Sequence, residues 1–311
     1  MKHWFTYPLI QHPYAPEFVG REGLVAIARA AEVAGFAGIG FTDHPAPSQK
    51  WLSAGGHDAL DPFVALTMVA AVTERMRLIP NILVLPYRNP FLVAKSAASL
   101  DVLSDSRFTL SVATGYLRSE YRALGVDFDQ RNQLFDEALA VLKGVWTQDE
   151  FAFEGRHFRA VDVTAHPRPA SHPHPPIWIG GNSGAARRRV AERADGWNPF
   201  PAPAGMARAV GTAAMQTPAD FAAGVADLRR RLEEAGRDPA TVDICFSTRA
   251  GGNPAKETFD ADAHREGIAA LAELGVTWLQ VGVPGDSPAH AIEVMEKYGE
   301  LVIAPHRAEL R

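Results

Sequence analysis

The sequence predicts a (β/α)8 barrel, the TIM-barrel fold, on three observations. Short apolar runs alternate strictly with helical patterns, which is typical of parallel strands joined by right-handed helical crossovers. The helices begin and end at residues with specific capping chemistry. The chain has 311 residues, of which 47% are hydrophobic, enough to close such a barrel as one unit. We therefore expect a single barrel domain over residues 1–311.

The expected strands are short apolar runs, and the expected helices separate them. The strands are Trp4–Ile10, Ala37–Thr42, Arg77–Leu85, Arg107–Ala113, Pro176–Gly180, Gly196–Phe200, Val242–Arg249 and Thr277–Val283. The helices are Glu22–Ala34, Pro62–Thr73, Phe91–Leu103, Arg131–Trp146, Gly184–Ala194, Ala219–Ala235, Ala263–Leu274 and Pro288–Val302.

Several helix ends carry clear signals. Thr217, Pro218 and Asp220 supply an N-cap hydroxyl, a proline at the first helical position and a capping-box acid. Ser287 opens the last helix in the same way, and Gly35 lies where a C-cap glycine belongs. These positions support the assigned helices beyond mere propensity.

Two connections are longer than the alternation requires. Thr147 to Pro176 forms an insertion between the fourth helix and the fifth strand, and Phe151 to Phe158 within it reads as a small hairpin. Pro201 to Gln216 follows the sixth strand. Loops on the C-terminal side of barrel strands carry sites and lids, so the second connection is expected near a site.

The composition excludes several classes of partner. Basic and acidic residues number 31 and 36, for a net charge of -5, and the basic residues are dispersed, so nucleic acid is not expected. No apolar stretch is long enough to span a membrane, and no signal peptide is recognisable. The single cysteine, Cys245, lies in an apolar run and is expected to be a buried hydrophobe. We expect a cytoplasmic protein.

The turn after the fifth strand is a candidate phosphate site. Gly180-Gly181-Asn182-Ser183 joins an apolar run directly to a helix. Glycines let backbone N–H groups approach a ligand, and a helix N-terminus attracts anions. An ordinary capped strand-to-helix turn fits these residues equally well, and the spacing matches neither nucleotide-binding fingerprint.

Polar residues end the other strands that meet at the same mouth. Asp43 and His44 follow the second strand, Asn81 and Ile82 lie in the third, and Thr114-Gly115-Tyr116 end the fourth. His44 is the one histidine at an expected strand end, so it is the candidate for proton transfer.

Two other polar groups attract attention. His157, His166, His172 and His174 lie in a proline-rich loop with no zinc spacing, so no metal is expected. The run Arg187–Arg189 covers a wide arc of a helix and is interpreted as mostly solvated, with one member able to reach an anion at the mouth.

Several short pieces occur in a specific order along nearly the whole chain. They are Ala34-Gly35-Phe36, Thr42-Asp43-His44, Leu85 to Pro90, Leu100 to Ser104, Thr114-Gly115-Tyr116 with Glu120 and Tyr121, and Trp178 to Asn182 followed by Asp195-Gly196-Trp197. Together they resemble the luciferase-like flavin and deazaflavin oxidoreductases, the family of bacterial luciferase, alkanesulfonate monooxygenase and the coenzyme F420-dependent dehydrogenases and reductases.

The resemblance implies a tricyclic cofactor across the barrel mouth. It implies that His44 lies near the reactive ring and that a non-prolyl cis peptide at Asn81-Ile82 lies behind the ring. We expect His44 to be catalytic, in proton transfer or ring polarisation, and Tyr116 to lie close enough to assist it. The implied cofactor-binding residues are Asp43, His44, Asn81, Ile82, Thr114, Gly115, Gly180, Gly181 and Asn182. The insertion would shape the substrate entrance. The resemblance also implies a small-molecule substrate, a homodimer and a separate reductase for the cofactor.

Two positions differ from the family pattern and limit the class of substrate that we expect. Sugar-phosphate dehydrogenases of this family have an acid after the fourth-strand glycine and a tryptophan four residues after the histidine. Here these places hold Tyr116 and Ser48, with Trp51 as a partial replacement for the ring. This argues against a sugar phosphate.

Three functions stay open from the sequence. The first is an F420-dependent oxidoreductase that moves a hydride between the deazaflavin C5 and an unsaturated or carbonyl-containing small molecule. The second is a monooxygenase that uses reduced FMN, and the third is a non-catalytic relative that only binds a cofactor. The fold alone cannot separate the first two.

Overall fold

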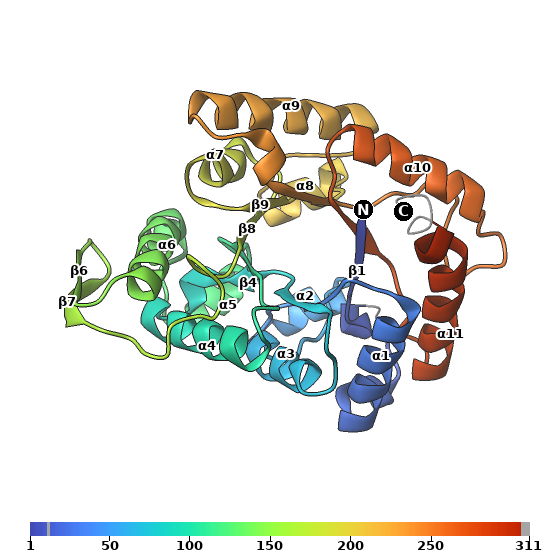
Figure 1. Ribbon diagram of the computed structural model, residues 1–311, viewed down its shortest axis with the longest axis horizontal. Helices are drawn as coiled ribbons and strands as arrows, with labels where there is room; N and C mark the ends of the chain where they lie inside the picture. The colour runs from blue at the N-terminus through green and yellow to red at the C-terminus, as the bar shows by residue number, and fades with distance from the viewer. Residues whose placement is uncertain (11–12, 306–311) are drawn as a thin grey trace.

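The computed structural model describes residues 1–10 and 13–305, and it has a parallel barrel at its centre (Figure 1). Its nine strand segments follow the order β3-β2-β1-β11-β10-β9-β8-β5-β4, and every pairing is parallel. The segments are β1 (Lys2–Thr6), β2 (Gly38–Phe41), β3 (Arg77–Pro80), β4 (Leu83–Val84), β5 (Leu110–Ala113), β8 (Ile177–Gly180), β9 (Gly196–Asn198), β10 (Asp243–Phe246) and β11 (Trp278–Val281).

The barrel closes where one expected strand is split in two. β3 and β4 are the two halves of the run predicted at Arg77–Leu85, and the Asn81-Ile82 peptide bond between them is cis. β4 pairs with β5, and an isolated parallel bridge joins Leu78 to Phe108, just before β5. The eight expected strands are therefore all present, and the predicted (β/α)8 barrel is confirmed.

Helices surround the barrel in Figure 1 as the alternation predicts. They are α1 (Arg21–Ala34), α3 (Pro62–Ala70), α4 (Pro90–Leu103), α6 (Arg131–Thr147), α7 (Gly184–Arg193), α9 (Pro218–Glu234), α10 (Ala261–Glu273) and α11 (Pro288–Tyr298), which continues as a π-helical turn over Gly299–Ile303. Three short helices were not predicted: α2 (Gln49–Ser53), α5 (Arg118–Ala123) and α8 (Ala204–Val210). Each lies in a connection that follows the C-terminal end of a strand, so these helices help to build the mouth.

The predicted caps form. Thr217 and Asp220 make a complete capping box at the start of α9, an arrangement that contributes about 1 kcal/mol. Ser287 accepts a hydrogen bond from the His290 N–H at the start of α11. Gly35 ends α1 with φ of 93°, a left-handed conformation that favours glycine.

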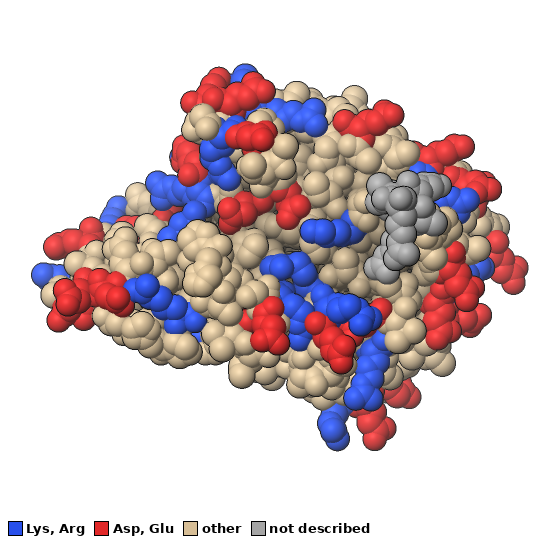
Figure 2. All heavy atoms as spheres, in the orientation of Figure 1, with Lys and Arg blue, Asp and Glu red and all other residues tan. Residues whose placement is uncertain are grey.

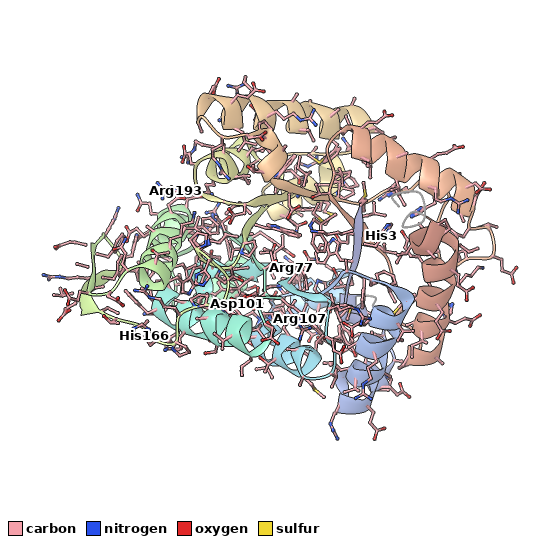
Figure 3. The ribbon with its side chains drawn as sticks, in the orientation of Figure 1. His3, Arg77, Asp101, Arg107, His166 and Arg193 are labelled. Atoms are coloured by element: carbon pink, nitrogen blue, oxygen red, sulfur yellow. The ribbon has the colours of Figure 1, made fainter. Side chains whose placement is uncertain are left out.

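Half-buried and buried polar groups stabilise the opposite, N-terminal end of the barrel (Figure 3). Arg107 donates to the carbonyl oxygens of Ala70 and Met76 at 3.0 and 3.2 Å. Asp101 on α4 is fully buried and accepts from the backbone N–H and the hydroxyl of Ser171. Nearby, Cys245 accepts from the Trp4 indole at 3.0 Å, and its burial confirms that it acts as a small apolar residue.

The insertion forms a hairpin, β6 (Phe151–Glu154) and β7 (Arg159–Val163), whose second strand runs beyond the predicted Phe158. It packs against α6, because a Cβ at Gly144 would lie 2.0 Å from the Phe151 ring. Among the described residues, none from 147–176 lines the pocket at the mouth. The expectation that this insertion shapes the substrate entrance is therefore wrong; the path of the chain carries it to the outer face of α6.

Acidic and basic side chains are interspersed over the face in Figure 2, without one continuous basic patch. Within residues 1–10 and 13–305, no helix has the length and apolar character needed to cross a bilayer.

Candidate active site

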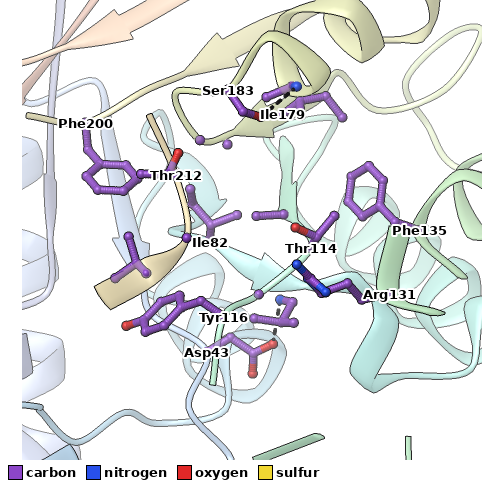
Figure 4. Close-up of a pocket in the computed structure, with 18 of the residues that line it drawn as sticks. Asp43, Ile82, Thr114, Tyr116, Arg131, Phe135, Ile179, Ser183, Phe200 and Thr212 are labelled. Atoms are coloured by element: carbon purple, nitrogen blue, oxygen red, sulfur yellow. Dashed lines mark hydrogen bonds between the residues drawn. The ribbon is translucent and has the colours of Figure 1, made fainter. Parts of the chain in front are cut away.

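A pocket of about 780 Å³ opens at the C-terminal ends of the barrel strands (Figure 4). Nine of the ten predicted site residues line it: Asp43, His44, Asn81, Ile82, Thr114, Gly115, Tyr116, Gly180 and Gly181. The tenth, Asn182, lies directly behind the wall. The strand ends therefore converge as expected of a barrel.

His44 is held by a buried carboxylate. Its Nδ1 lies 3.2 Å from Oε2 of Glu120, a residue of α5 with no exposed surface. The same oxygen accepts a hydrogen bond from the Tyr87 hydroxyl at 2.9 Å, and Oε1 accepts from the Ala46 N–H at 3.2 Å. Because an ionised carboxylate only accepts, His44 donates from Nδ1, which leaves Nε2 for a ligand.

Three aromatic side chains surround the His44 ring. The ring centroids of Trp51 and His57 lie 4.5 and 4.9 Å from that of His44, and Tyr116 lies at 6.1 Å. Burial, and then the negative charge of Glu120, raise the pKa of Tyr116 to about 12, so this phenol stays protonated. Burial lowers the pKa of His57 and favours its neutral form.

These neighbours resolve the two departures seen in the sequence. Ser48, at the place of the missing tryptophan, caps α2 by accepting from the Trp51 N–H, and α2 brings the Trp51 ring against His44. Tyr116 stands at the place of the missing acid, and Glu120, four residues later on α5, supplies a carboxylate beside His44. The chain thus has both groups near His44, from different positions.

Asp43 serves chiefly to fix the backbone of the mouth. Its carboxylate accepts from the Val84 N–H at 2.9 Å and from Arg88 at 2.8 Å, and Arg88 also reaches Asp61. Burial raises the pKa of Asp43, while the Arg88 charge opposes the shift. The side chain therefore ties β2 to β4, and its role toward a cofactor stays a proposal.

A polar network crosses the barrel beneath the pocket. Asn81 donates to Thr6 at 2.6 Å and accepts from Asn198 at 3.1 Å, and Gln280 also donates to Thr6. The cis peptide that the resemblance implied at Asn81-Ile82 is confirmed. A Cβ at Gly180 would lie 2.3 Å from Ile82 Cδ1, so glycine gives this side chain its space.

The glycine turn meets the requirements of a phosphate site. Gly181 has φ of 101°, and the Ser183 hydroxyl caps α7 by accepting from the Ala186 N–H at 3.2 Å. The first N–H groups of a helix lack partners within the helix and carry partial positive charge. Ser183, Ala185 and Ala186 all line the pocket. This donor set fits the phosphate of a flavin or deazaflavin tail.

Asn182 supports this turn from behind. Its side chain is 1% exposed, donates to the carbonyl oxygens of Phe200 and Ala213, and accepts from the Phe200 N–H. Its own N–H donates to Thr212 Oγ1 at 3.0 Å. The residue therefore fastens the segment 200–213 over the turn, and we assign it a positioning role in place of direct contact.

The arginine run is less solvated than predicted. Arg189 is 5% exposed, pairs with Asp136 and lines the pocket, so one member does reach the mouth. Arg187 pairs with Asp227 on α9. Of the three arginines, only Arg188 has the predicted solvated side chain. Helix packing turns Arg187 toward α9 and Arg189 toward α6.

The match to a protein family covers most of the chain. Residues 3–271 match the family described as luciferase-like monooxygenase. The chain belongs to this family. The expected family resemblance is therefore confirmed, and the luciferase-like enzymes are oxidoreductases and monooxygenases.

One curated relative is named for its dependence on reduced FMN. The FMNH2-dependent dimethylsulfone monooxygenase of Pseudomonas putida is 39% identical over 130 residues, or 41% of this chain. The match spans 35% of the length of this monooxygenase and 63% of the length of a second curated relative, an uncharacterised protein of Mycobacterium bovis. The chain thus matches less than two thirds of either relative.

Solved structures share the fold at low identity. Monooxygenase RslO1 from Streptomyces bottropensis has a TM-score of 0.80 at 20% identity, covering 98% of this chain and 100% of its own. The coenzyme F420-dependent tetrahydromethanopterin reductase from Methanopyrus kandleri has a TM-score of 0.73 at 16% identity, covering 98% and 99%. At these identities, the likeness shows a shared fold.

Some pocket residues escaped the sequence reasoning. His57, Arg118, Arg131 and Arg208 all line the pocket, and none was a candidate. Glu120 was part of the family pattern without a role. Among the described residues, no cluster of potential metal ligands occurs.

Proposed function

We propose that this chain is a coenzyme F420-dependent oxidoreductase that transfers a hydride between the deazaflavin and an unsaturated or carbonyl-containing small molecule. The observation that carries the proposal is His44, a pocket histidine whose Nδ1 is held by the buried carboxylate of Glu120. When bound, the deazaflavin supplies two-electron hydride chemistry at C5.

In this hydride transfer, the protein must supply the proton that the reduced substrate takes up. Reduction of a carbonyl group adds a hydride to carbon and leaves negative charge on oxygen, which a proton must neutralise. With its Nδ1–H held by Glu120, a His44 imidazolium can give its Nε2 proton to this oxygen and become the neutral ring; in the reverse direction, the neutral ring accepts that proton at Nε2. Tyr116 is protonated and lies beside His44, so it can donate a hydrogen bond to the same oxygen.

The remaining pocket residues would hold the cofactor. We assign the ring to the wall formed by Asn81 and Ile82, and the phosphate to the turn at Gly180–Ser183 with Thr114 opposite. Tyr121 supports this wall by donating to the Thr114 carbonyl oxygen. Among the described lining residues, four are arginines and one, Asp43, is acidic, which favours an anionic cofactor.

The second candidate is a monooxygenase that uses reduced FMN. The sequence match to the Pseudomonas putida enzyme favours it, and so does the fold likeness to RslO1. FMN also presents a tricyclic ring and a tail phosphate, so the turn at Gly180–Ser183 suits both cofactors. What favours the deazaflavin is the number of arginines beyond those a single phosphate needs.

A titration separates the two candidates. The purified chain, free of cofactor, is titrated with oxidised F420 and with FMN, and the absorbance spectrum gives each dissociation constant. We expect F420 to bind at least about tenfold more tightly, a difference of about 1.4 kcal/mol. Tighter binding of FMN would make the oxygen-dependent reaction the leading function. The homodimer, the cytoplasmic location and the separate reductase stay predictions.

A further inference from the structure

One wall of the pocket carries two arginines stacked on a single ring. The guanidinium carbons of Arg118 and Arg131 lie 4.0 and 3.9 Å from the ring centroid of Phe128. Phe128 belongs to a 3-10 turn, Phe128–Gln130, between α5 and α6, and all three side chains line the pocket. We call this group the arginine clamp. Stacking on a shared ring holds the two cations at defined places.

The positive charges of the arginine clamp are not neutralised by a buried carboxylate among the described residues. Arg118 pairs with Asp129 at 3.2 Å, but both side chains are mostly exposed, so this pair is weak and exchangeable. Among the described residues, Arg131 has a carbonyl partner, Phe128 O at 2.9 Å, and no carboxylate partner. Asp127 is engaged with the Asp129 N–H and the Gln130 amide. A ligand carboxylate can therefore bind here without displacing a buried ion pair.

The position of Arg131 is a second, independent indication. It is the first residue of α6, a helix of 17 residues. Cations are unfavourable at a helix N-terminus, where the dipole already places positive charge. Arg131 thus adds a positive charge where folding alone disfavours one, and a bound anion would offset this repulsion.

The clamp lies on the wall that carries Thr114. Figure 4 shows Arg131 extending toward Thr114, with Phe135 of α6 beside it, across the pocket from Phe200 and Thr212. The same wall continues through Asn132 to Arg189 and the start of α7. A ligand whose phosphate occupies the turn at Gly180–Ser183 therefore has a basic surface within the same pocket for further anionic groups.

We propose that the arginine clamp binds carboxylates of the oligoglutamate tail of the deazaflavin cofactor. This inference rests on the proposed function, because FMN ends at its phosphate and has no such carboxylates. Guanidinium groups bind carboxylates through paired, charge-assisted hydrogen bonds, and two of them suit a tail with several carboxylates. The clamp would then distinguish tailed deazaflavins from FMN.

Three ligands test the clamp in the unaltered protein. They are the deazaflavin core without a tail, F420 with its phospholactate but without glutamates, and F420 with several glutamates. We expect the glutamate-bearing form to bind roughly tenfold more tightly than the glutamate-free form, with an advantage that shrinks as salt rises. Equal affinities for these two forms would overturn the inference while leaving the proposed function intact.

Variants locate the effect. Arg118→Met and Arg131→Met should each remove most of the glutamate-dependent gain and leave the affinity for the core unchanged. Arg122→Met is the matched control, since Arg122 is an exposed residue of α5 that does not line the pocket; it should retain the gain. Loss of core affinity in all three variants would contradict a specific clamp. If no deazaflavin binds while FMN does, the proposed function fails and the inference fails with it.

Discussion

The Nδ1 atom of His44 lies 3.2 Å from a carboxylate oxygen of Glu120, which is completely buried. The two residues come from the end of β2 and from α5, so the contact links two separate connections at the barrel mouth. The Tyr87 hydroxyl and the Ala46 N–H hold the carboxylate in place from other sides. Glu120 therefore sets both the orientation and the tautomer of the histidine at the pocket.

Glu120→Gln should reduce turnover much more than cofactor affinity. The amide keeps the size of the side chain but lacks the negative charge that favours the imidazolium. If the amide donates to Nδ1, the neutral ring carries its hydrogen on Nε2, so Nε2 can no longer accept a proton. We expect turnover to fall about 100-fold, at the low end of general acid–base effects. Steady-state kinetics and cofactor titration measure the two effects. Tyr87→Phe, which removes one hydrogen bond to the same oxygen, is the control and should lose less. Wild-type turnover in Glu120→Gln would contradict this role.

His44 and Glu120 should act as one unit. If Glu120 works through His44, His44→Ala already removes its effect, and the double variant should be no slower than His44→Ala alone. Turnover of the two single variants and the double variant completes the cycle. Additive losses would mean that Glu120 acts independently of His44. Turnover unchanged by His44→Ala would remove this histidine from the mechanism.

Asn182→Ala should destabilise the mouth and weaken cofactor binding indirectly. The change removes an amide that is 1% exposed and leaves the N–H and carbonyl oxygen of the half-buried Phe200, and the carbonyl oxygen of the exposed Ala213, without that partner. A loss of about 2 kcal/mol in the free energy of unfolding is expected for such groups. Chemical denaturation measures this loss. Gln216→Ala is the control, because Gln216 is exposed and lies just after the segment 200–213. Equal stability of both variants would refute the positioning role.

Stability should fall as the pH drops below neutrality, partly through His264. This buried histidine lies 2.8 Å from the Ala250 carbonyl oxygen and 3.1 Å from the Tyr298 hydroxyl, which His3 also contacts. Burial lowers its pKa below the ordinary value, while the bond to Ala250 opposes the shift. The unfolded chain therefore takes up the proton first, so the contribution is present above about pH 6.5 and is lost as pH falls toward the folded pKa.

Thermal unfolding at about pH 7.5 and about pH 5.5 tests this sign, since the window spans the ordinary histidine pKa. His264→Gln should show a smaller decrease in Tm between the two conditions than the wild type. The exposed His166 is the control, and His166→Gln should keep the wild-type decrease. A wild-type decrease in His264→Gln would assign the pH dependence to other groups.

The barrel was predictable because its signals are local. Each signal is complete within a few consecutive residues. This holds for the apolar runs, for the capping box at Thr217 and for the glycine turn at Gly180. The short helices α2, α5 and α8 escaped prediction, since one or two turns give little periodicity. The second hairpin strand was also placed too early, because its alternation is interrupted by the turn residues after Gly155.

The site was only partly predictable because its decisive contacts join distant residues. The position of His44 and Tyr116 at strand ends predicts that both lie at the pocket, as they do. The contact of His44 with Glu120 spans 76 positions and has no local sequence pattern. Likewise, His57 reaches His44 only because the loop after β2 turns back over the mouth. Asn182 looked like a ligand-binding residue, yet folding directs its amide to the segment 200–213.

The most direct test of hydride transfer follows the transferred hydrogen itself. Reduced F420 carrying deuterium at C5 is mixed with the protein and a panel of small enones and carbonyl compounds without oxygen, and the products are examined by mass spectrometry. The proposed function predicts deuterium on a product carbon and oxidised F420 in equal amount. No deuterium transfer, together with oxygen-18 incorporation from labelled O2 when reduced FMN is supplied, would contradict it.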